Sequence, residues 1–231
     1  MRATLTLCLA LAAVPALGAG PTPSGPLDGM FVHLDGRSVL TDCHGGQRVA
    51  VDPEGDAAAL ERAYRTATRQ PGAPLWVSLL GHVESRQKPD GGQEEALVVD
   101  RFARVDAGRG CASNIELPSA RWTLVRLQGR PVPAADGRPA ASLEFEAGKG
   151  RLSGSTGCNR INGEYRSWGV TGFAVMPLAT TRMACPAPLA AQEAALLHAL
   201  NSATHRIQAG NVLELLAGGV PVARFEAESP R

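Results

Sequence analysis

G-R-L-S-G-S-T-G-C-N-R-I-N-G-E-Y at residues 150–165 and P-L-A-T-T-R-M-A-C-P at residues 177–186 are the most informative stretches of this chain. Each contains one cysteine, Cys158 or Cys185, among small, polar and turn-forming residues. Glycine and asparagine at such density are typical of tight turns. Apolar residues on either side predict short strands at 151–155 and 163–166. We therefore expect a strand-rich domain with two cysteine-bearing turns.

The rest of the second half extends this pattern. Alternation from Arg121 to Leu127 is typical of a half-buried strand. Further strands are expected at 142–146, 172–175, 206–208, 212–216 and 220–226. The spacing of apolar residues from Leu189 to Leu200 predicts one helix, with Pro186 and Pro188 at its start.

The first half predicts about five strands around one helix, an order that suits a small OB-type β-barrel. Apolar runs predict strands at 30–34, 38–42, 48–51, 75–83 and 96–105. The helix is expected to begin after Asp56 as N-cap and to end before Pro71-Gly72. Residues 88–92 are the expected hairpin turn. The predicted fold class is mainly β (α+β): an OB-type barrel followed by an antiparallel β-rich domain, each with one helix.

The N-terminus is typical of an exported protein. Residues 1–20 predict a cleaved signal peptide, because the apolar run from Leu5 to Val14 is too short to span a bilayer. Cys8 lacks the full apolar region that precedes the cysteine of a lipobox, so we interpret it as a signal-peptide residue. Residues 21–27 predict a disordered segment, 28–111 the first domain, 112–118 a linker and 119–227 the second domain. No later segment is apolar enough to suggest a transmembrane span.

Several motifs in order resemble known families. The second half, with W-x-L-x-x-L-x-G at Trp122–Gly129 and the two stretches quoted above, resembles the META domain of HslJ-like bacterial envelope proteins. The first half is similar to the C-terminal OB domain of the NlpE family of envelope-stress and copper-resistance lipoproteins, through Thr41-Asp42-Cys43, 60–64, Gly81-His82 and Val98-Val99-Asp100. The lipidated cysteine and C-x-x-C domain of that family have no counterpart here. The resemblance therefore implies an envelope-stress role without extending to membrane anchoring or copper handling.

The mature chain would carry four cysteines: Cys43, Cys111, Cys158 and Cys185. An even number in an exported protein is typical of disulfides, and four cysteines allow three pairings. Pairing within each half is the simplest, and a Cys158–Cys185 bond closing about 30 residues would contribute roughly 3–4 kcal/mol of chain entropy. Free buried thiols are the alternative.

A ligand site is predicted beside the second cysteine pair. If Cys158 bonds Cys185, the side chains of Asn159, Arg160, Asn162 and Arg182 come together and could bind a carboxylate, a phosphate or a glycan. The alternative, which we favour, is that the amides form turns and the arginines bond backbone carbonyls. Trp168, beside Gly169 in a predicted turn, is the aromatic residue expected at the surface.

Metal-ligand candidates gather in the first half. They are His33, His44 and His82, with Asp42 and Cys43. Adjacent residues on a strand point to opposite faces, and an oxidised Cys43 could not coordinate. We therefore predict no metal and no cofactor. Enzyme-like strings also fail, since residues 85–88 match S-x-x-K without opening a helix and residues 154–157 lack the spacing of a nucleophile elbow. No catalytic residue is predicted.

The charge pattern limits the partners. Basic and acidic residues are interspersed, with a net charge of +1, so nucleic-acid binding is not expected. We expect a non-enzymatic, secreted or periplasmic envelope protein, a stress-related binding or maintenance factor with an envelope protein or a glycan as partner. The alternatives are a periplasmic module that binds glycan, peptide or metal, and a metal-dependent hydrolase.

Overall fold

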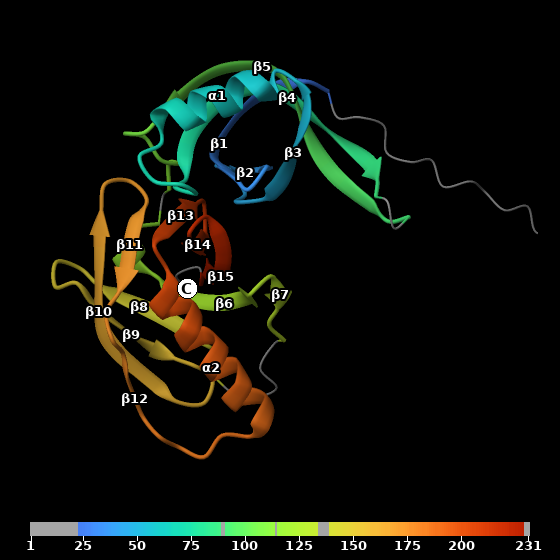
Figure 1. Cartoon of the computed structure of the whole chain (residues 1–231). Coiled ribbons are helices and arrows are strands. Elements are labelled where there is room, and N and C mark those ends of the chain that lie inside the picture. The colour runs from blue at the N-terminus through green and yellow to red at the C-terminus, as the bar shows by residue number, and fades with distance from the viewer. Residues whose placement is uncertain (1–22, 89–90, 114, 134–138, 229–231) are drawn as a thin grey trace, which may run out of the picture.

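The computed structural model describes residues 23–88, 91–113, 115–133 and 139–228. Figure 1 shows two β-domains, the first above the second, each with one helix. This confirms the predicted fold class. The predicted signal peptide, including Cys8, lies outside the described residues. Within those residues, no helix combines the length and the apolar character needed to cross a membrane.

The first domain is a closed five-stranded barrel. Its elements are β1 (Gly25–Leu34), β2 (Arg37–Asp42), β3 (Arg48–Gly55), α1 (Ala57–Ala67), β4 (Leu75–Gln87) and β5 (Gln93–Asp106). The strand order is β1-β2-β3-β5-β4, and β1 closes the barrel by pairing with β4. α1 buries Leu60 and Tyr64 in a core that also contains Phe31 and Leu97. The helix lies between strands three and four, as the sequence predicts.

One local expectation for this domain is wrong, and a second is confirmed. Residues 25–27 were assigned to a disordered segment, yet they form the start of β1, because they pair with residues 79–81 of β4. Asp56 is the N-cap residue of α1, as expected, although its side chain makes no capping hydrogen bond. Its carboxylate instead accepts a hydrogen bond from the Phe102 amide at 2.8 Å, which ties the start of the helix to β5.

The second domain is an antiparallel sheet that closes on itself, with α2 packed against β6, β11, β14 and β15. After the short 3₁₀ helix η1 (Leu117–Ser119), its elements are β6 (Arg121–Leu127), β7 (Arg130–Pro131), β8 (Ser142–Glu146), β9 (Arg151–Ser155), β10 (Arg160–Trp168), β11 (Gly172–Val175), β12 (Ala179–Thr180), α2 (Ala187–Ser202), β13 (His205–Ala209), β14 (Val212–Ala217) and β15 (Val220–Ala227). The strand order is β11-β13-β14-β15-β6-β8-β9-β10-β12, and β10 also pairs with β11. The core is centred on Trp122, Phe173, Phe225 and Leu196.

A third apolar cluster joins the two domains. Met30, Val32 and Trp76 of the barrel pack with Ile207, Ala209 and Leu216 of the second domain, beside Cys43 and Cys111. Trp76 is only 2% exposed, and the Arg109 guanidinium lies 3.9 Å from the centre of its ring. The predicted linker begins directly after Cys111. It contacts the second domain, because the Ser113 hydroxyl donates to the Gly210 carbonyl at 2.9 Å. The domains therefore share a core.

A buried ion pair crosses the same boundary. Arg48 of β3 donates to the carboxylate of Glu214 on β14 at 2.8 Å, and the Glu214 side chain is 3% exposed. Arg224 of β15 donates to the Gly46 carbonyl at 2.6 Å. A carboxylate so deeply buried requires a partner, because an uncompensated buried charge is strongly destabilising. Arg48 is therefore part of what holds the second domain against the first.

Replacing Arg48 with Leu should lower the free energy of unfolding by about 3 kcal/mol, because Glu214 then loses its closest cation while buried. The double variant R48L/E214L should recover most of that loss. Urea unfolding of the oxidised protein measures both effects. R101L, at an exposed position on β5, is the control and should change stability little. An R48L variant as stable as the R101L control would contradict this account of the interface.

Candidate functional site

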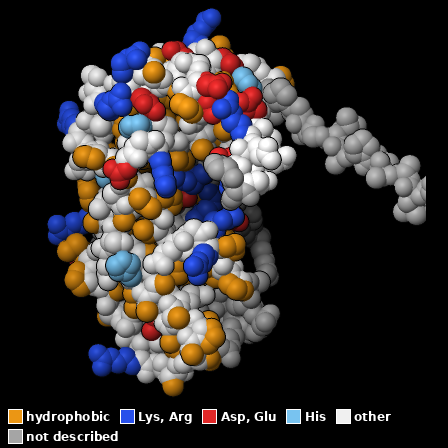
Figure 2. All heavy atoms as spheres, turned by 45° about the vertical axis from the view of Figure 1, so that its right-hand side comes forward, with side chains coloured by type: hydrophobic (Ala, Val, Ile, Leu, Met, Phe, Trp, Pro, Cys, Tyr) orange, Lys and Arg blue, Asp and Glu red, His pale blue; other side chains and the backbone are white. Residues whose placement is uncertain are grey.

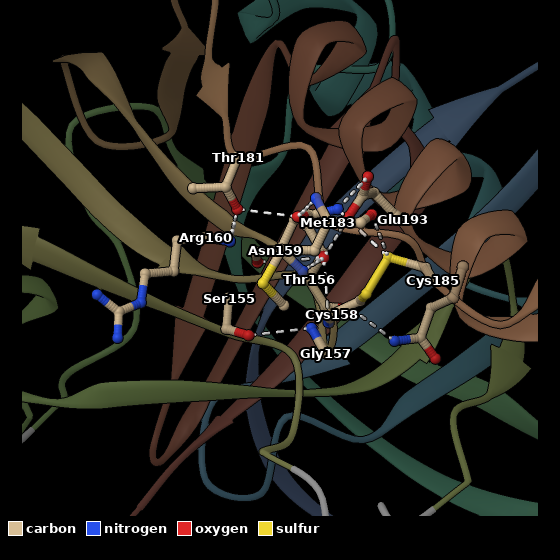
Figure 3. The surroundings of a disulfide bond; sticks show 11 residues. Ser155, Thr156, Gly157, Cys158, Asn159, Arg160, Thr181, Met183, Cys185 and Glu193 are labelled. Atoms are coloured by element: carbon tan, nitrogen blue, oxygen red, sulfur yellow. Dashed lines mark hydrogen bonds between the residues drawn. A yellow bond between two sulfur atoms is a disulfide. The ribbon is translucent and has the colours of Figure 1, made fainter.

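The Cys158–Cys185 disulfide organises the conspicuous motifs of the second domain (Figure 3). Cys158 lies in the turn from β9 to β10, and Cys185 lies just before α2. The structure has this bond and the bond between Cys43 and Cys111, the pairing within each half that the sequence favours. We call residues 156–159 the cysteine loop. The Cys158–Cys185 disulfide connects this loop to the segment that leads into α2.

A buried hydrogen-bond network holds the cysteine loop in place (Figure 3). The fully buried Thr156 hydroxyl donates to one carboxylate oxygen of Glu193 at 2.6 Å. The Asn159 side-chain amide donates to the other at 3.1 Å. The Asn159 side-chain oxygen accepts from the Thr181 hydroxyl and from the Met183 amide, at 2.9 and 2.8 Å. Both functional groups of Asn159 are therefore occupied within the protein.

The glycines of the motif are needed for close packing. A Cβ at position 154 would lie 2.1 Å from the Ser142 carbonyl oxygen, and one at position 163 would lie 2.5 Å from a methyl carbon of Leu178. Gly157 has a φ of +92°, which is strained for residues with a side chain. The glycines of the motif therefore allow β8, β9 and β10 to pack closely and allow the chain to turn between β9 and β10.

The structure separates the predicted ligand residues into two groups. Asn159 is 3% exposed and points into the network. Arg160, Asn162 and Trp168 lie on the outer face of β10, because every second side chain of a strand points the same way. Arg182 is exposed in the loop after β12. The amide of its neighbour, Thr181, donates to the Arg160 carbonyl at 3.1 Å, which places this loop beside the start of β10.

The outer face of β10 borders a shallow groove of about 760 Å³. We call this surface the β10 face; its lining includes Glu146, Arg151, Ser153, Asn162 and Glu164. A hydrogen bond from Lys149 lowers the pKa of the Glu146 carboxyl, which keeps this residue anionic. The groove therefore offers carboxylate, guanidinium and amide groups side by side, a set suited to hydroxyl-rich or peptide ligands.

Trp168, at the far end of β10, is 50% exposed. It pairs across the strands with Gly172, and a Cβ on that glycine would lie 2.3 Å from the indole nitrogen. The ring thus covers a glycine in the neighbouring strand β11, which is itself paired on its other side with β13. Its other side remains available to a ligand.

The histidine candidates do not form one site. Cys43 is bonded to Cys111 and so has no free thiolate. The His33 ring contacts the Ser38 hydroxyl at 2.8 Å, the His82 ring contacts Asp100 at 3.1 Å, and the exposed His44 lies 3.4 Å from Asp42. Among the described residues, no three ligand-type side chains are grouped so that they could hold a metal ion.

Thr156, Thr181, Met183 and Glu193 take part in the cysteine loop network and are not predicted as site residues. Glu193 lies within the predicted helix, and Thr156 lies within the string 154–157 that lacks the spacing of a nucleophile elbow. The two lie 37 positions apart in the sequence, so local spacing carries no signal that they meet.

Family comparisons agree with this division of the molecule. Residues 21–112 match the model of the NlpE C-terminal OB domain, and residues 115–229 match the model of the META domain. The chain joins an NlpE-type OB domain to a META domain. The cysteine loop, the β10 face and Trp168 all belong to the META domain, whereas the histidines discussed above belong to the OB domain.

Three solved structures show partial similarity. The crystal structure of the Cpx pathway activator NlpE from Escherichia coli is 24% identical, with a TM-score of 0.36, and covers 46% of this chain and 54% of that one. An NMR structure of a protein from Burkholderia xenovorans is 27% identical, with a TM-score of 0.39, and covers 49% and 85%. A further NMR structure is 26% identical, with a TM-score of 0.40, and covers 48% and 91%. No curated protein matched the chain. The domain assignment therefore rests on the family models.

Replacing Asn159 with Ala should lower the free energy of unfolding by about 2 kcal/mol, because the half-buried Glu193 carboxylate and the Met183 amide each lose a partner. N162A removes the same side chain three positions further on, from the exposed side of β10, and should change stability by less than about 0.5 kcal/mol. Urea unfolding with the disulfides intact measures the difference. Equal losses in the two variants would contradict a scaffolding role for Asn159.

Proposed function

We propose that the protein is a secreted, periplasmic factor of the bacterial cell envelope that acts in envelope stress by binding a partner, without catalysis. The observation that carries the proposal is the fusion of an NlpE-type OB domain to a META domain through a shared core. The sequence of each domain resembles a family of bacterial envelope proteins. Because the two domains share a core, we treat them as one unit that binds the partner.

The cysteines support the compartment. Disulfides form and persist in oxidising compartments such as the bacterial periplasm. Cys43–Cys111 closes most of the OB domain with a separation of 68 residues, and Cys158–Cys185 closes a META segment with a separation of 27. Together with the predicted signal peptide at residues 1–20, the two bonds favour export.

The cysteine loop supports binding over catalysis. Thr156 beside Glu193 has the composition of a nucleophile with a base, yet Thr156 is fully buried. Its oxygen also accepts a hydrogen bond from the Asn159 amide at 2.9 Å. The Thr156 hydroxyl therefore stabilises the cysteine loop and is inaccessible to a substrate.

The β10 face is the surface that we propose for the partner. Arg160, Asn162 and Trp168 share it, with Arg182 in the adjoining loop. β10 presents guanidinium, amide and carboxylate groups along this face and an exposed indole at its far end, and sugars are bound by such hydrogen-bonding groups and by stacking on such a ring. A periplasmic glycan is therefore the first ligand to test, and an envelope protein the second.

Deletion of the gene should sensitise its host to a membrane-perturbing detergent, and the full chain should restore growth. A leaderless form beginning at residue 21 is the matched control and should fail, because its cysteines would stay reduced in the cytoplasm. Rescue by the leaderless form would overturn the periplasmic assignment. Intact mass and non-reduced peptide mapping of the periplasmic protein should show loss of the leader and the linkages Cys43–Cys111 and Cys158–Cys185.

Soluble peptidoglycan fragments should change the tryptophan fluorescence of the protein. Trp76 and Trp122 are 2% and 0% exposed, so the change reports mainly on Trp168. W168A should abolish it, and W168F should retain binding by calorimetry, since a phenyl ring still stacks. Binding by W168A as tight as by the wild-type protein would remove Trp168 from the site. Capture of an envelope protein by a photo-crosslinker at position 162, without glycan binding, would favour the protein partner instead.

A further inference from the structure

A second hollow lies between the two domains, away from the β10 face. It encloses about 540 Å³, and its lining includes Arg48 of the OB domain with Arg126, Arg224, Glu214 and Glu226 of the META domain. We call it the arginine groove. Figure 2 shows Lys and Arg side chains gathered in the recess between the upper and lower halves of the molecule. No residue of the predicted ligand site lines this groove.

The guanidiniums of the groove exceed what the fold itself requires. Arg224 and Arg126 are directly opposite each other on β15 and β6. Like charges in that position destabilise a sheet, so their pairing needs a reason. Glu214 accepts from Arg48 at 2.8 Å and lies 4.0 Å from Arg224. These contacts account for the Arg48 charge and part of the Arg224 charge.

Within the described part of the chain, the Arg126 guanidinium forms no ion pair with a carboxylate. It is exposed, and its one hydrogen bond among the described residues is a 3.4 Å contact with the Gly129 carbonyl. Arg224 uses one nitrogen on the Gly46 carbonyl, which leaves its other donors for a ligand. Among the residues that the structure describes, three guanidiniums and two carboxylates line the groove, an excess of one positive charge. That balance suits a singly charged anion.

An apolar trough continues the groove. A neighbouring hollow of about 440 Å³ shares Arg48 and Pro221 with it and is lined by Val32, Leu34, Val39 and Val220, together with Asp35, Arg37 and Gly219. Val220 is 56% exposed. A ligand that places its charge at Arg126 and Arg224 could therefore lay an apolar group along this trough.

We propose that the arginine groove binds a carboxylate carried on a short apolar group. Arg126 and Arg224 donate paired hydrogen bonds to the carboxylate, the geometry that guanidinium and carboxylate groups favour. Val220 and its neighbours in the trough contact the apolar part. The groove already contains one carboxylate held by a guanidinium, that of Glu214, which accepts a hydrogen bond from Arg48 at 2.8 Å. The ligand chemistry fits a fatty-acid chain or a peptide carboxyl terminus with an apolar last residue.

Calorimetry with the full mature protein tests the site. The probes are octanoate and N-acetyl-Val-Leu, each compared with its primary amide, which removes the charge. Binding of octanoate alone assigns an acyl chain, and binding of the peptide alone assigns a peptide terminus; either result supports the shared chemistry. The amides should bind at least about tenfold more weakly, since they lose a charge-assisted pair. Amides that bind as well as the acids, no binding of either acid at millimolar concentration, or equal binding of inorganic phosphate would overturn the proposal.

Three variants place the ligand. R126Q should weaken binding of the acid about tenfold or more, and R126K should recover it in part, because lysine keeps the charge and loses the paired geometry. V220N should weaken binding of the acids, because it removes an apolar contact in the trough. R121Q is the matched control: Arg121 is exposed on the same strand, pairs with Glu144 and lies outside the groove. All positions changed are exposed, and urea unfolding verifies the fold. Unchanged affinity in R126Q, or an equal loss in R121Q, would overturn the assignment.

Discussion

The burial of Trp76 between the two domains is the constraint on which the rest of the molecule depends. Its ring belongs to the outside of the OB barrel, packs with Ile207 and Leu216 of the META domain, and is covered by Arg109. The Cys43–Cys111 bond lies beside this cluster and fixes the segment that leads from β5 into the META domain. Because tryptophan buries so much apolar area, separating the domains would expose the largest side chain of the boundary. The arginine groove exists because the domains are held in this position.

The META motif is explained mainly by what it does for the fold. Gly154 and Gly163 allow neighbouring backbone and side chains to approach, and Thr156 and Asn159 each donate a hydrogen bond to one oxygen of the Glu193 carboxylate. Buried polar networks of this kind specify one arrangement because every partial alternative leaves a group unsatisfied. A match to the motif therefore identifies the fold, and function must be sought at side chains that the network leaves free. Those lie on the β10 face and in the arginine groove.

Sequence reasoning succeeded where the signal is local. Alternation predicted β6, and helical spacing with Pro186 and Pro188 predicted α2, because each pattern is set by neighbours along the chain. It failed at residues 25–27, where pairing with β4 overrides a composition typical of disorder. The two-residue strands β7 and β12 carry no periodicity at all. Arg126 and Arg224 meet through the pairing of β6 with β15, and Arg48 joins them through the docking of the two domains. No local spacing in the sequence predicts either contact.

The two proposed surfaces differ in what they can influence. The β10 face is built by the META domain alone, so a partner bound there need not affect how the domains pack. The arginine groove takes Arg48 from the barrel and Arg126 and Arg224 from the META sheet. A ligand that binds the docked domains and not the separated ones stabilises the docked form by mass action. Occupancy of the groove would therefore strengthen the same boundary that Trp76 and the Arg48–Glu214 pair maintain, and would couple an apolar anion to the rigidity of the whole protein.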